Sequence, residues 1–474
     1  MVCPRRLYCC RAPRVLIRVR ATVNLIGARA AMATSKPIAA TAPHTDPVAS
    51  TPVQTSFVVD AGIPTRQGPP GICFDFNYGA RVKVEGAGWR IKLIDRDAGH
   101  TLYDATVEDA LVTSTKRYYV NFRVEVHRNE HLVFEHDFDL RGQNVYFRLP
   151  VGTLGDILAW FPYVEEFRRQ HGCQVYVSMS PAIWSLFEGA YPELNFIRPE
   201  EEAARRAEFY ASYYLGIFFP ATDRTHQPTD FRMSGLQKTI PHLLGLQPLE
   251  RRASVVLEDQ ARPIAEPYVC IAAQASTQCK YWNHPTGWFE VVQFLKEQGY
   301  RVLCIDQKHA HGAGNSWNLI PYGAENFTGD LPLQQRANLL QHADFFVGLS
   351  SGLSWLAWTL EKPVVMVSGF THPANEFFTP YRVIDYHACN SCWNDTNIQF
   401  DHHDFMWCPR HAGTERQFEC TRLITPRQVI TAISRLMQDH RLKPMKTDAA
   451  STTQAGAACK STLPDAEHRI LKCA

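Results

Sequence analysis

Residues 70–148 alternate between apolar and polar side chains in short runs with a period of two. Gly, Asp and Asn residues separate these runs, as turn residues separate antiparallel strands. The pattern therefore predicts a small antiparallel sheet or barrel at residues 70–148. The runs that carry it are Cys73–Phe76, Ala80–Val84, Trp89–Ile94, Tyr118–Val126, Leu132–Glu135 and Asn144–Leu149.

After Leu149 the pattern changes, because short apolar strands now alternate with long amphipathic stretches. This is the rhythm of βαβ units and parallel sheets. Two blocks show it, at residues 149–250 and 266–385, and a helix is expected at 423–445. The fold class is therefore predicted to be α/β, with two doubly wound, Rossmann-like halves that enclose a cleft. Ligands of such sheets bind beyond the carboxyl ends of the strands.

The two ends of the chain differ from the middle. Residues 1–45 contain no acidic residue and seven arginines, a composition that resembles a transit peptide. Alternatively, Met32 opens a Thr/Ala/Pro-rich stretch and the preceding residues are an upstream start-codon artefact. We expect residues 1–69 and 446–474 to be disordered, because both have low-complexity character.

Composition excludes several classes of protein. The chain has 474 residues, of which 45% are hydrophobic and 20% charged, as in folded globular proteins. The net charge of +2 is too small for the positive field of a non-specific nucleic-acid binder. Because no run approaches the ~18 apolar residues that a membrane span needs, we predict no transmembrane segment.

A strand ending at Leu149 leads through a glycine-containing turn into a predicted helix with Asp156 near its start. Gly152 and Gly155 would let the backbone approach a ligand closely, and Asp156 would face the cleft between the halves. The alternative is that Asp156 only caps the helix, stabilising it by about 1 kcal/mol. Spacing alone leaves both interpretations open.

A second motif, Ala272–Trp288, follows the first strand of the second block. Lys280 can offset the charge of a diphosphate there, with Ser276 and Thr277 donating hydrogen bonds. The alternative is a solvated surface lysine.

The third motif is an apolar strand, a Gly/Ser turn and a helix over Ala343–Trp358. The backbone N–H groups of Ser351, Gly352 and Leu353 would be exposed at the helix N-terminus, where they can bind a phosphate without a metal. An ordinary small-residue turn is the alternative. The chain contains neither a Walker loop nor a complete GxGxxG, which argues against P-loop hydrolysis and a standard dinucleotide site.

Four of the 14 cysteines lie within 32 residues, with the spacing C-x2-C-x15-C-x11-C. Four thiolates make a closed tetrahedral site that suits zinc or iron, so we interpret the cluster as a structural metal finger. Its place in a chain without export features indicates a reducing compartment rather than disulfides. The nearby His387, His402, His403 and His411 are interpreted as structural or interface residues. The predicted ligands are Cys389, Cys392, Cys408 and Cys420.

In this order, Leu154-Gly-Asp156, Lys280-Tyr-Trp282 and the turn Gly348–Trp355 resemble the lipopolysaccharide heptosyltransferases of glycosyltransferase family 9, which have the GT-B fold. The bacterial autotransporter heptosyltransferases are more similar still, over about residues 70–440. The segments that carry this resemblance are Ser351–Trp358, Phe377–Ile384, Cys389–Asp395 and Phe400–Phe405.

The resemblance implies an inverting protein O-heptosyltransferase. Its members transfer heptose from ADP-glycero-manno-heptose to serine hydroxyls of autotransporter adhesin passengers, bind iron with four cysteines and form large homo-oligomeric rings. By resemblance Asp156 corresponds to the general base, Lys280 to the diphosphate-binding lysine, and the turn from Ser350 through Ser351 and Gly352 to Leu353 to the nucleotide-diphosphate cradle.

The resemblance also sets the remaining expectations. One ferric iron per subunit is expected, with zinc as the alternative, and no catalytic divalent metal. A cytoplasmic bacterial location is expected. Two other functions stay open: a lipopolysaccharide heptosyltransferase or another nucleotide-sugar transferase of the same fold, and a metal-finger interaction protein on an inactive transferase scaffold.

Overall fold

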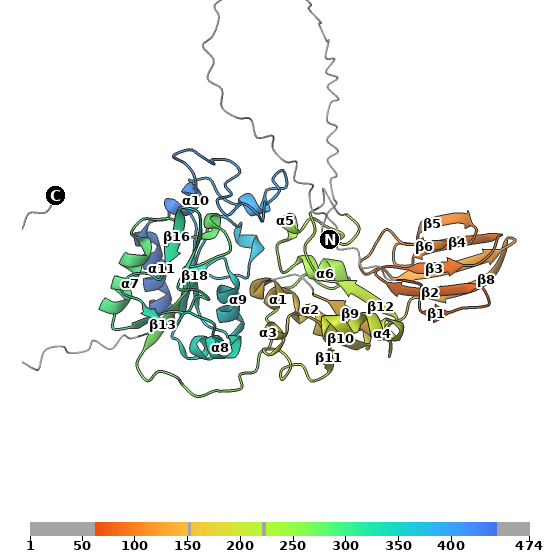
Figure 1. Ribbon diagram of the computed structural model, residues 1–474, viewed down its shortest axis with the longest axis horizontal. Coiled ribbons are helices and arrows are strands. Elements are labelled where there is room, and N and C mark those ends of the chain that lie inside the picture. The colour runs from red at the N-terminus through yellow and green to blue at the C-terminus, as the bar shows by residue number, and fades with distance from the viewer. Residues whose placement is uncertain (1–61, 150–152, 220–223, 443–474) are drawn as a thin grey trace, which may run out of the picture. The chain divides into compact units, whose positions relative to one another are not determined.

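The computed structural model describes residues 62–149, 153–219 and 224–442 (Figure 1). The predicted disorder of residues 1–61 and 446–474 therefore lies outside the described residues. Among the described residues, no helix is long and apolar enough to cross a membrane.

Ordered structure begins before residue 70, where the sequence prediction placed it. Strand β1 (Arg66–Gln67) pairs antiparallel with β2 (Ile72–Asn77). The backbone N–H of Thr65 also donates to Asp75 Oδ2 at 3.0 Å. Polar residues of the low-complexity segment thus join the sheet by pairing with β2.

Antiparallel strands follow up to residue 137, as the alternation predicts. One group runs β1–β2–β3–β6, and a separate four-stranded sheet has the order β5–β4–β7–β8. In β4, Trp89, Ile91 and Leu93 are buried, whereas the residues between them are partly exposed, so the period of two sets the core face. The strands are β3 (Arg81–Val84), β4 (Trp89–Asp95), β5 (His100–Val107), β6 (Leu111–Thr113), β7 (Phe122–Arg128) and β8 (His131–Asp137).

The structure corrects two parts of the β-domain prediction. The antiparallel strands do not form one self-contained sheet or barrel, because β2 also pairs parallel with β12 (Ala211–Tyr214) and thereby extends the first parallel sheet. In addition, Asn144–Leu149 does not belong to the antiparallel region. It forms β9 (Asn144–Arg148), which pairs parallel with both of its neighbours. Its three consecutive buried residues, Val145–Phe147, are typical of a strand covered on both faces.

The parallel part of the first sheet has the order β11–β10–β9–β12. Helix α2 packs on it with Tyr163, Val164 and Phe167, which are fully buried. The further elements of this part are α1 (Leu154–Trp160), α2 (Pro162–His171), β10 (Gln174–Ser178), α3 (Pro181–Trp184), β11 (Leu194–Phe196), η1 (Pro199–Glu201), α4 (Glu202–Arg205), η2 (Arg206–Glu208), α5 (Phe231–Ser234) and α6 (Thr239–Leu244).

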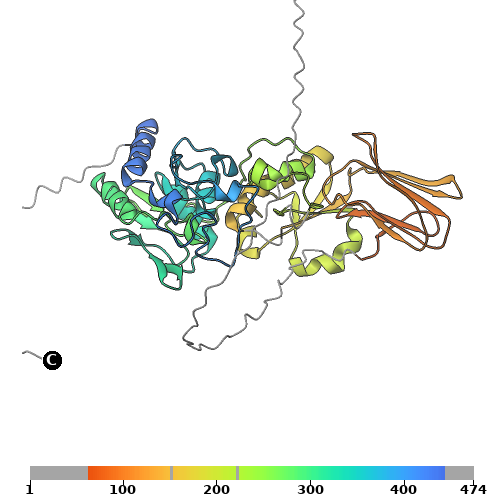
Figure 2. The same ribbon diagram turned by 90° about the horizontal axis from the view of Figure 1, so that it is seen from above.

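The second sheet is parallel throughout, with the order β17–β14–β13–β18–β19–β20. Its helices α7 and α11 run side by side on one face, and α8 and α9 cover the other (Figures 1 and 2). Its elements are β13 (Tyr268–Ile271), η3 (Gln278–Lys280), α7 (Gly287–Glu297), β14 (Arg301–Cys304), β17 (Glu325–Asn326), α8 (Leu333–His342), β18 (Phe346–Leu349), α9 (Gly352–Thr359), β19 (Val364–Val367), η4 (Pro373–Asn375), β20 (Arg382–Val383) and α11 (Pro426–Asp439).

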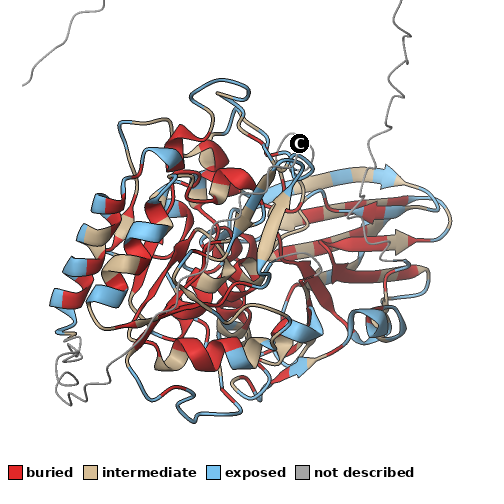
Figure 3. Cartoon of the chain, turned by 60° about the vertical axis from the view of Figure 1, so that its left-hand side comes forward, coloured by how far each residue is buried: buried red, intermediate tan, exposed pale blue. Residues whose placement is uncertain are grey.

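Successive residues of the central strand β13 serve two cores. Val269 and Ile271 pack with α7 and α11, whereas Cys270 and Ala272 pack toward α8 and α9. Figure 3 shows the consequence, with buried strands inside and exposed outer faces on the helices. The predicted C-terminal helix is α11, which is shorter than the predicted range 423–445.

Two segments stand apart from this α/β architecture. Strands β15 (Ala310–Ala313) and β16 (Ser316–Leu319) form a hairpin. Residues 386–422, which are all described, contain only the helical turns η5 (Cys392–Asn394) and α10 (Glu419–Arg422) as regular elements. Packing of this cysteine segment therefore depends on its side chains.

Candidate active site and cysteine cluster

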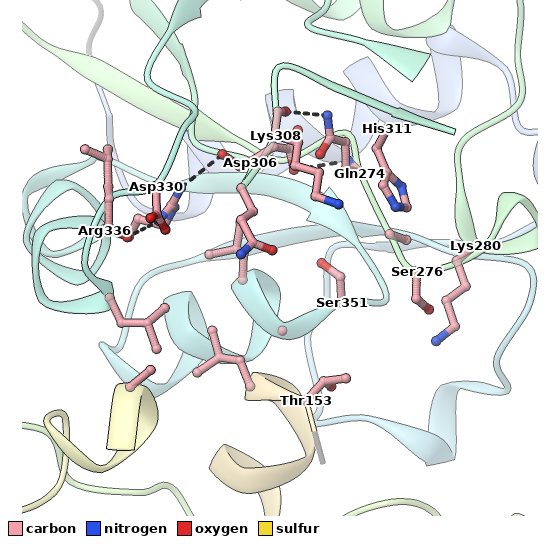
Figure 4. A pocket seen from close by; sticks show the side chains of 18 of the residues that line it. Thr153, Gln274, Ser276, Lys280, Asp306, Lys308, His311, Asp330, Arg336 and Ser351 are labelled. Carbon is pink, nitrogen blue, oxygen red and sulfur yellow. Dashed lines mark hydrogen bonds between the residues drawn. The ribbon is translucent and has the colours of Figure 1, made fainter. Parts of the chain in front are cut away.

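A cavity of about 690 Å³ lies at the carboxyl ends of the second sheet's strands (Figure 4). Segments after β13, β14 and β18 line it, as expected for ligand sites of parallel sheets. The first half contributes its wall at the start of α1. The lining residues are Thr153, Leu154, Ala182, Gln274, Ala275, Ser276, Lys280, Asp306, Gln307, Lys308, His311, Asp330, Leu331, Pro332, Leu333, Arg336, Ser350, Ser351, Gly352 and Leu353.

Two of the three predicted residues after β13 line this cavity. Ser276 is exposed there, and Lys280 ends η3 beside it. Among the described residues, Lys280 makes no ion pair. Thr277 differs, because its side chain is buried and its hydroxyl lies 3.2 Å from Cys279 Sγ. The structure therefore brings Ser276 and Lys280, but not Thr277, to the cavity wall.

The turn after β18 brings all four of its predicted residues, Ser350–Leu353, to the cavity. Ser351 is the N-cap of α9, and its side chain faces the cavity in Figure 4. Its Oγ is buried and has no hydrogen-bond partner within the described part of the chain. Because the first N–H groups of a helix lack partners inside the helix, this start of α9 offers several unpaired donors to a ligand.

Side chains behind the turn hold it in place. Ser350 donates a very short hydrogen bond to the buried carboxylate of Glu376. Arg382 Nη1 donates to the other oxygen of that carboxylate at 2.7 Å, and both side chains are nearly inaccessible. Ser354 Oγ donates to Leu349 O at 2.5 Å. These contacts fix the backbone that presents the free N–H groups of α9.

Asp156 lies in the first turn of α1 and is half-buried. Its Oδ2 accepts hydrogen bonds from the backbone N–H of Thr153 at 2.6 Å and from Thr153 Oγ1 at 2.9 Å. Asp156 does not itself line the cavity, although Thr153 and Leu154 do. The geometry places Asp156 at the helix entrance, as predicted, and engages its carboxylate in a capping contact.

The two helix starts pack against each other through their glycines. A Cβ on Gly155 would lie 2.9 Å from Trp355 Cδ1, and one on Gly352 would lie 2.9 Å from Leu154 Cβ. Gly155 was predicted to let the backbone approach a ligand; that prediction is wrong, because its close neighbour is α9. Gly152 lies outside the described residues. The contact brings the Asp156 turn next to the Ser351 turn.

Several charged lining residues carried no recognisable motif. Asp306 follows β14, and burial raises its pKa to about 6. Its carboxylate accepts from the backbone N–H groups of Ala273 at 2.8 Å and Gln274 at 3.1 Å. Arg336 is also buried, and burial lowers its pKa, while its guanidinium donates to backbone carbonyls, including Ile305 O at 3.1 Å. The only sequence signal for Asp306 is its position directly after a parallel strand.

His402, interpreted above as structural or interfacial, also lies near the predicted site residues. Its pKa is lowered first by burial and then by the charge of Lys280, while Asp156 acts in the opposite direction. Its ring packs edge-on against Phe400 at 4.7 Å between centroids.

The four cysteines of the predicted finger form no disulfides, and Cys389, Cys392 and Cys408 belong to one apolar cluster. Cys392 and Cys420 are buried, and Cys389 and Cys408 are half-buried. Burial raises the pKa of Cys420, and the neighbouring Cys392, Cys279, Cys389 and Cys408 raise it further. Arg410 Nη1 lies 3.6 Å from Cys389 Sγ and its Nη2 donates to Asp395 at 2.5 Å.

A different set of possible metal ligands lies close together within the described residues. One ligand atom each from Cys389, His411 and Glu419 lies within 4.8 Å of the others. Glu419 is engaged, because it accepts from the Cys389 backbone N–H at 3.0 Å and pairs with Arg416 at 2.7 Å. The structure therefore contains a possible metal site at Cys389, and His411 lies closer to it than the sequence interpretation implied.

The comparisons show that this fold is that of the glycosyltransferase family 9 heptosyltransferases. The family model "Glycosyltransferase family 9 (heptosyltransferase)" matches residues 227–402, and that for the N-terminal domain of glycosyltransferase TibC matches residues 68–130. The chain is 48% identical over 384 residues to the autotransporter heptosyltransferase BAHTCr of Citrobacter rodentium, covering 81% of this chain and 93% of that protein.

TibC of Escherichia coli O78:H11 is 48% identical over 390 residues, covering 82% of this chain and 95% of TibC. A crystal structure of TibC, an iron-containing dodecameric glycosyltransferase, matches with a TM-score of 0.77 at 47% identity and covers 80% of this chain and 98% of that one. A second TibC structure, in complex with ADP-D-beta-D-heptose, gives a TM-score of 0.78 at 46% identity, over 81% of this chain and 100% of that one.

The inactive autotransporter heptosyltransferase BimC of Burkholderia thailandensis is 41% identical over 373 residues, which cover 79% of this chain and 88% of BimC. The chain belongs to the autotransporter heptosyltransferases, a group of family 9 glycosyltransferases. The predicted family membership, enzyme class and α/β transferase fold are thereby confirmed.

Proposed function

We propose that this enzyme transfers heptose from ADP-glycero-manno-heptose to serine hydroxyls of an autotransporter adhesin passenger, with inversion at the anomeric carbon. The observation that carries the proposal is the cavity where an uncapped helix start and an unpaired lysine face the start of α1. A nucleotide diphosphate fits the first two features, because helix N-termini and cationic side chains bind phosphate oxygens. The complex of the related TibC with ADP-heptose supports the choice of donor.

In this mechanism Asp156 accepts the proton of the acceptor serine as its oxygen attacks the anomeric carbon. The bond from that carbon to the diphosphate oxygen breaks, and ADP leaves with the negative charge. Lys280 and the N–H groups of Ser351–Leu353 stabilise that charge, with Ser276 and Ser350 on the same wall. The cation and the helix start supply the positive charge that a divalent ion supplies in other nucleotide-sugar enzymes, so no catalytic divalent metal is required.

We further propose that Cys389, Cys392, Cys408 and Cys420 hold one ferric iron per subunit, with zinc as the alternative. The chemistry of the donor set supports the proposal, because all four thiols are free, two of them are buried, and Cys389, Cys392 and Cys408 share one apolar cluster. When bound, the metal cross-links a segment that has few regular elements. TibC is described as iron-containing and dodecameric, which supports iron and a large homo-oligomer here. We place the enzyme in the bacterial cytoplasm.

The donor and acceptor are tested together by co-expression. The enzyme is expressed with a candidate autotransporter in cells able or unable to make ADP-heptose, and the intact mass of the passenger is measured. We expect heptose increments that disappear in the deficient cells and map to serines. Mass increments that persist in cells without ADP-heptose would exclude the proposed donor. An unmodified passenger in cells whose lipopolysaccharide is modified would favour the alternative of a lipopolysaccharide heptosyltransferase.

The similarity to inactive BimC supports a second candidate, an inactive transferase scaffold. Purified protein incubated with ADP-heptose distinguishes the two, because a scaffold releases no ADP above the uncatalysed rate. We expect ADP release that increases when the passenger is added.

The metal proposal is tested by elemental analysis of protein purified without a metal-binding tag. We expect one iron per chain with visible absorbance, and loss of metal and of assembly in Cys408→Ser. His411→Asn is the matched control: it keeps the metal if four thiolates bind it and loses it if Cys389, His411 and Glu419 do. Less than about a tenth of an equivalent of any transition metal in folded, active protein would contradict the four-thiolate site.

A further inference from the structure

Three aromatic rings surround the ammonium group of Lys280. Its Nζ lies 5.5 Å from the ring centroid of Phe370, 5.8 Å from that of Trp393 and 5.9 Å from that of Phe400. A lysine ammonium within about 6 Å of a ring face is attracted by the ring's quadrupole. All three rings come from residues 370–400, far along the chain from the lysine.

The three rings form a fixed box rather than a flexible contact. Their centroids lie 5.4–5.7 Å apart in every pairing. None of the three residues is more than 9% exposed. Trp393 Nε1 also donates to Asn375 Oδ1 at 3.1 Å, and the buried Phe231 packs on the indole at 5.5 Å. The ring positions are therefore fixed by packing, and the lysine side chain adopts the conformation that places its ammonium against them.

Two walls of the box, Trp393 and Phe400, belong to the cysteine segment (residues 386–422), and Phe370 packs against both of them. Trp393 directly follows Cys392, and both belong to the same buried cluster as Phe370 and Phe400. Two backbone hydrogen bonds join the segments: Ser391 N–H donates to Gly369 O at 2.8 Å and Trp393 N–H to Phe370 O at 3.2 Å. The conformation of the cysteine segment thereby determines where the box stands.

The box leaves the lysine's hydrogen-bonding capacity free. Within the described part of the chain no carboxylate pairs with Lys280. Ring faces attract the charge without occupying the three N–H donors in conventional hydrogen bonds. A free lysine side chain would lose considerable rotamer entropy when it binds an anion. A lysine already held by three rings loses less of it.

We propose that Phe370, Trp393 and Phe400 are positioning residues that hold the Lys280 ammonium at the cavity for a nucleoside diphosphate, so that the cysteine segment acts on donor binding through this lysine. The inference rests on the diphosphate-binding role of Lys280 proposed above. It adds that the metal-binding segment and the donor site are coupled within one subunit.

The test is a double-mutant cycle with ADP as the probe, in the full-length, metal-loaded assembly. Trp393→Leu removes the ring, whereas Trp393→Phe keeps a ring; both lose the hydrogen bond to Asn375. We expect Trp393→Leu to weaken ADP binding by roughly 3- to 10-fold, the cost of ordering one long side chain. Trp393→Phe should recover most of the affinity. In a Lys280→Ala background, Trp393→Leu should cause almost no further loss.

Three outcomes overturn the inference. Equal losses from Trp393→Leu with and without Lys280 would show that the tryptophan acts through the fold and not through the lysine. If Trp393→Leu leaves the ADP affinity unchanged while Lys280→Ala lowers it, the box does not position the lysine. If Lys280→Ala itself binds ADP normally, the proposed role of Lys280 fails first, so the two failures are distinguishable.

Two further variants guard against misfolding. Phe400→Leu removes another wall of the box and repeats the cycle if Trp393→Leu does not fold. Trp407→Leu truncates an aromatic residue of the same buried cluster that makes no cation–π contact with Lys280, although its ring lies 4.8 Å from that of Phe400 and 6.0 Å from that of Phe370. A loss of ADP affinity in Trp407→Leu as large as in Phe400→Leu would assign the effect to packing of the cluster and overturn the inference.

Discussion

Two of the helices that begin at the cavity, α1 and α9, begin in opposite ways. At the start of α1, the carboxylate of Asp156 accepts hydrogen bonds from both the backbone and the side chain of Thr153. At the start of α9, no acidic residue occupies the first turn, and the N-cap Ser351 makes no side-chain capping bond. Both starts carry unpaired N–H groups and the partial positive charge of a helix N-terminus.

This difference separates two chemical tasks. In the proposed mechanism the carboxylate of Asp156, at the start of α1, acts as the base. The open start of α9 leaves the same potential to an incoming anion, with Lys280 adding a full charge nearby. Because Gly155 and Gly352 let the helices touch, the acidic and the anion-binding starts lie side by side. The proposed inverting mechanism needs this arrangement, since the base and the leaving group act on one carbon.

The strongest test of this contrast is Asp156→Asn. The amide keeps the shape and can still accept a hydrogen bond from Thr153, but it cannot take up the proton. We expect transfer to fall roughly 10²–10⁴-fold while ADP binding and folding are retained. Single-turnover heptose transfer and ADP affinity measured on the same preparation check this. Near-normal turnover by the folded variant would reduce Asp156 to a helix cap.

On the opposite wall, Lys280→Ala removes the full positive charge beside α9. Loss of a charge-assisted contact is worth on the order of 1.5–3 kcal/mol, or about 10- to 150-fold in ADP affinity and turnover together. Calorimetric ADP titration and steady-state kinetics measure the two effects. If neither changes, Lys280 is an ordinary surface lysine and α9 binds the anion without it.

The sequence predicted the parts of this contrast that depend on local patterns. Apolar strands followed by small residues identified the turn at Ser350–Leu353 and the position of Asp156, and the second parallel sheet follows from the same rhythm. It did not predict that β2 would join the first parallel sheet, because a strand's partner at a sheet edge is set by tertiary packing. β9 was misassigned because its run was interpreted as antiparallel alternation, whereas it is an interior strand that pairs parallel on both sides.

The rest of the cavity could not be predicted, because its residues have no local signature. Arg336 lies near the start of α8, and a helical arginine is usually a solvated surface residue. Only the fold buries its guanidinium against carbonyl groups. The aromatic box around Lys280 is likewise built from distant segments. The local sequence around each of its three aromatic residues therefore predicts only a core residue.

Ser351→Asp would make the two helix starts alike. The new carboxylate can cap α9 and would occupy the positive potential that the diphosphate needs. We expect the fold to be stabilised by up to about 1 kcal/mol and ADP binding to weaken by about tenfold or more. Thermal unfolding and ADP titration measure both. Ser351→Asn is the matched control, since it has the same size without the charge; an equal loss of affinity in both variants would indicate a steric effect.

The smallest expected effect concerns the other helix start. Thr153→Ala removes the hydroxyl that donates to Asp156 at 2.9 Å but leaves the backbone N–H bond at 2.6 Å. Because one capping contact survives, we expect the free energy of unfolding to fall by about 1 kcal/mol or less. Turnover should change by less than about threefold, since the carboxylate stays near its position. Denaturant unfolding and steady-state kinetics are measured on both Thr153→Ala and Asp156→Asn. If the two variants lose similar stability but differ greatly in turnover, proton transfer is assigned to Asp156. If stability and turnover fall in parallel in both variants, the whole turn acts only as a helix cap.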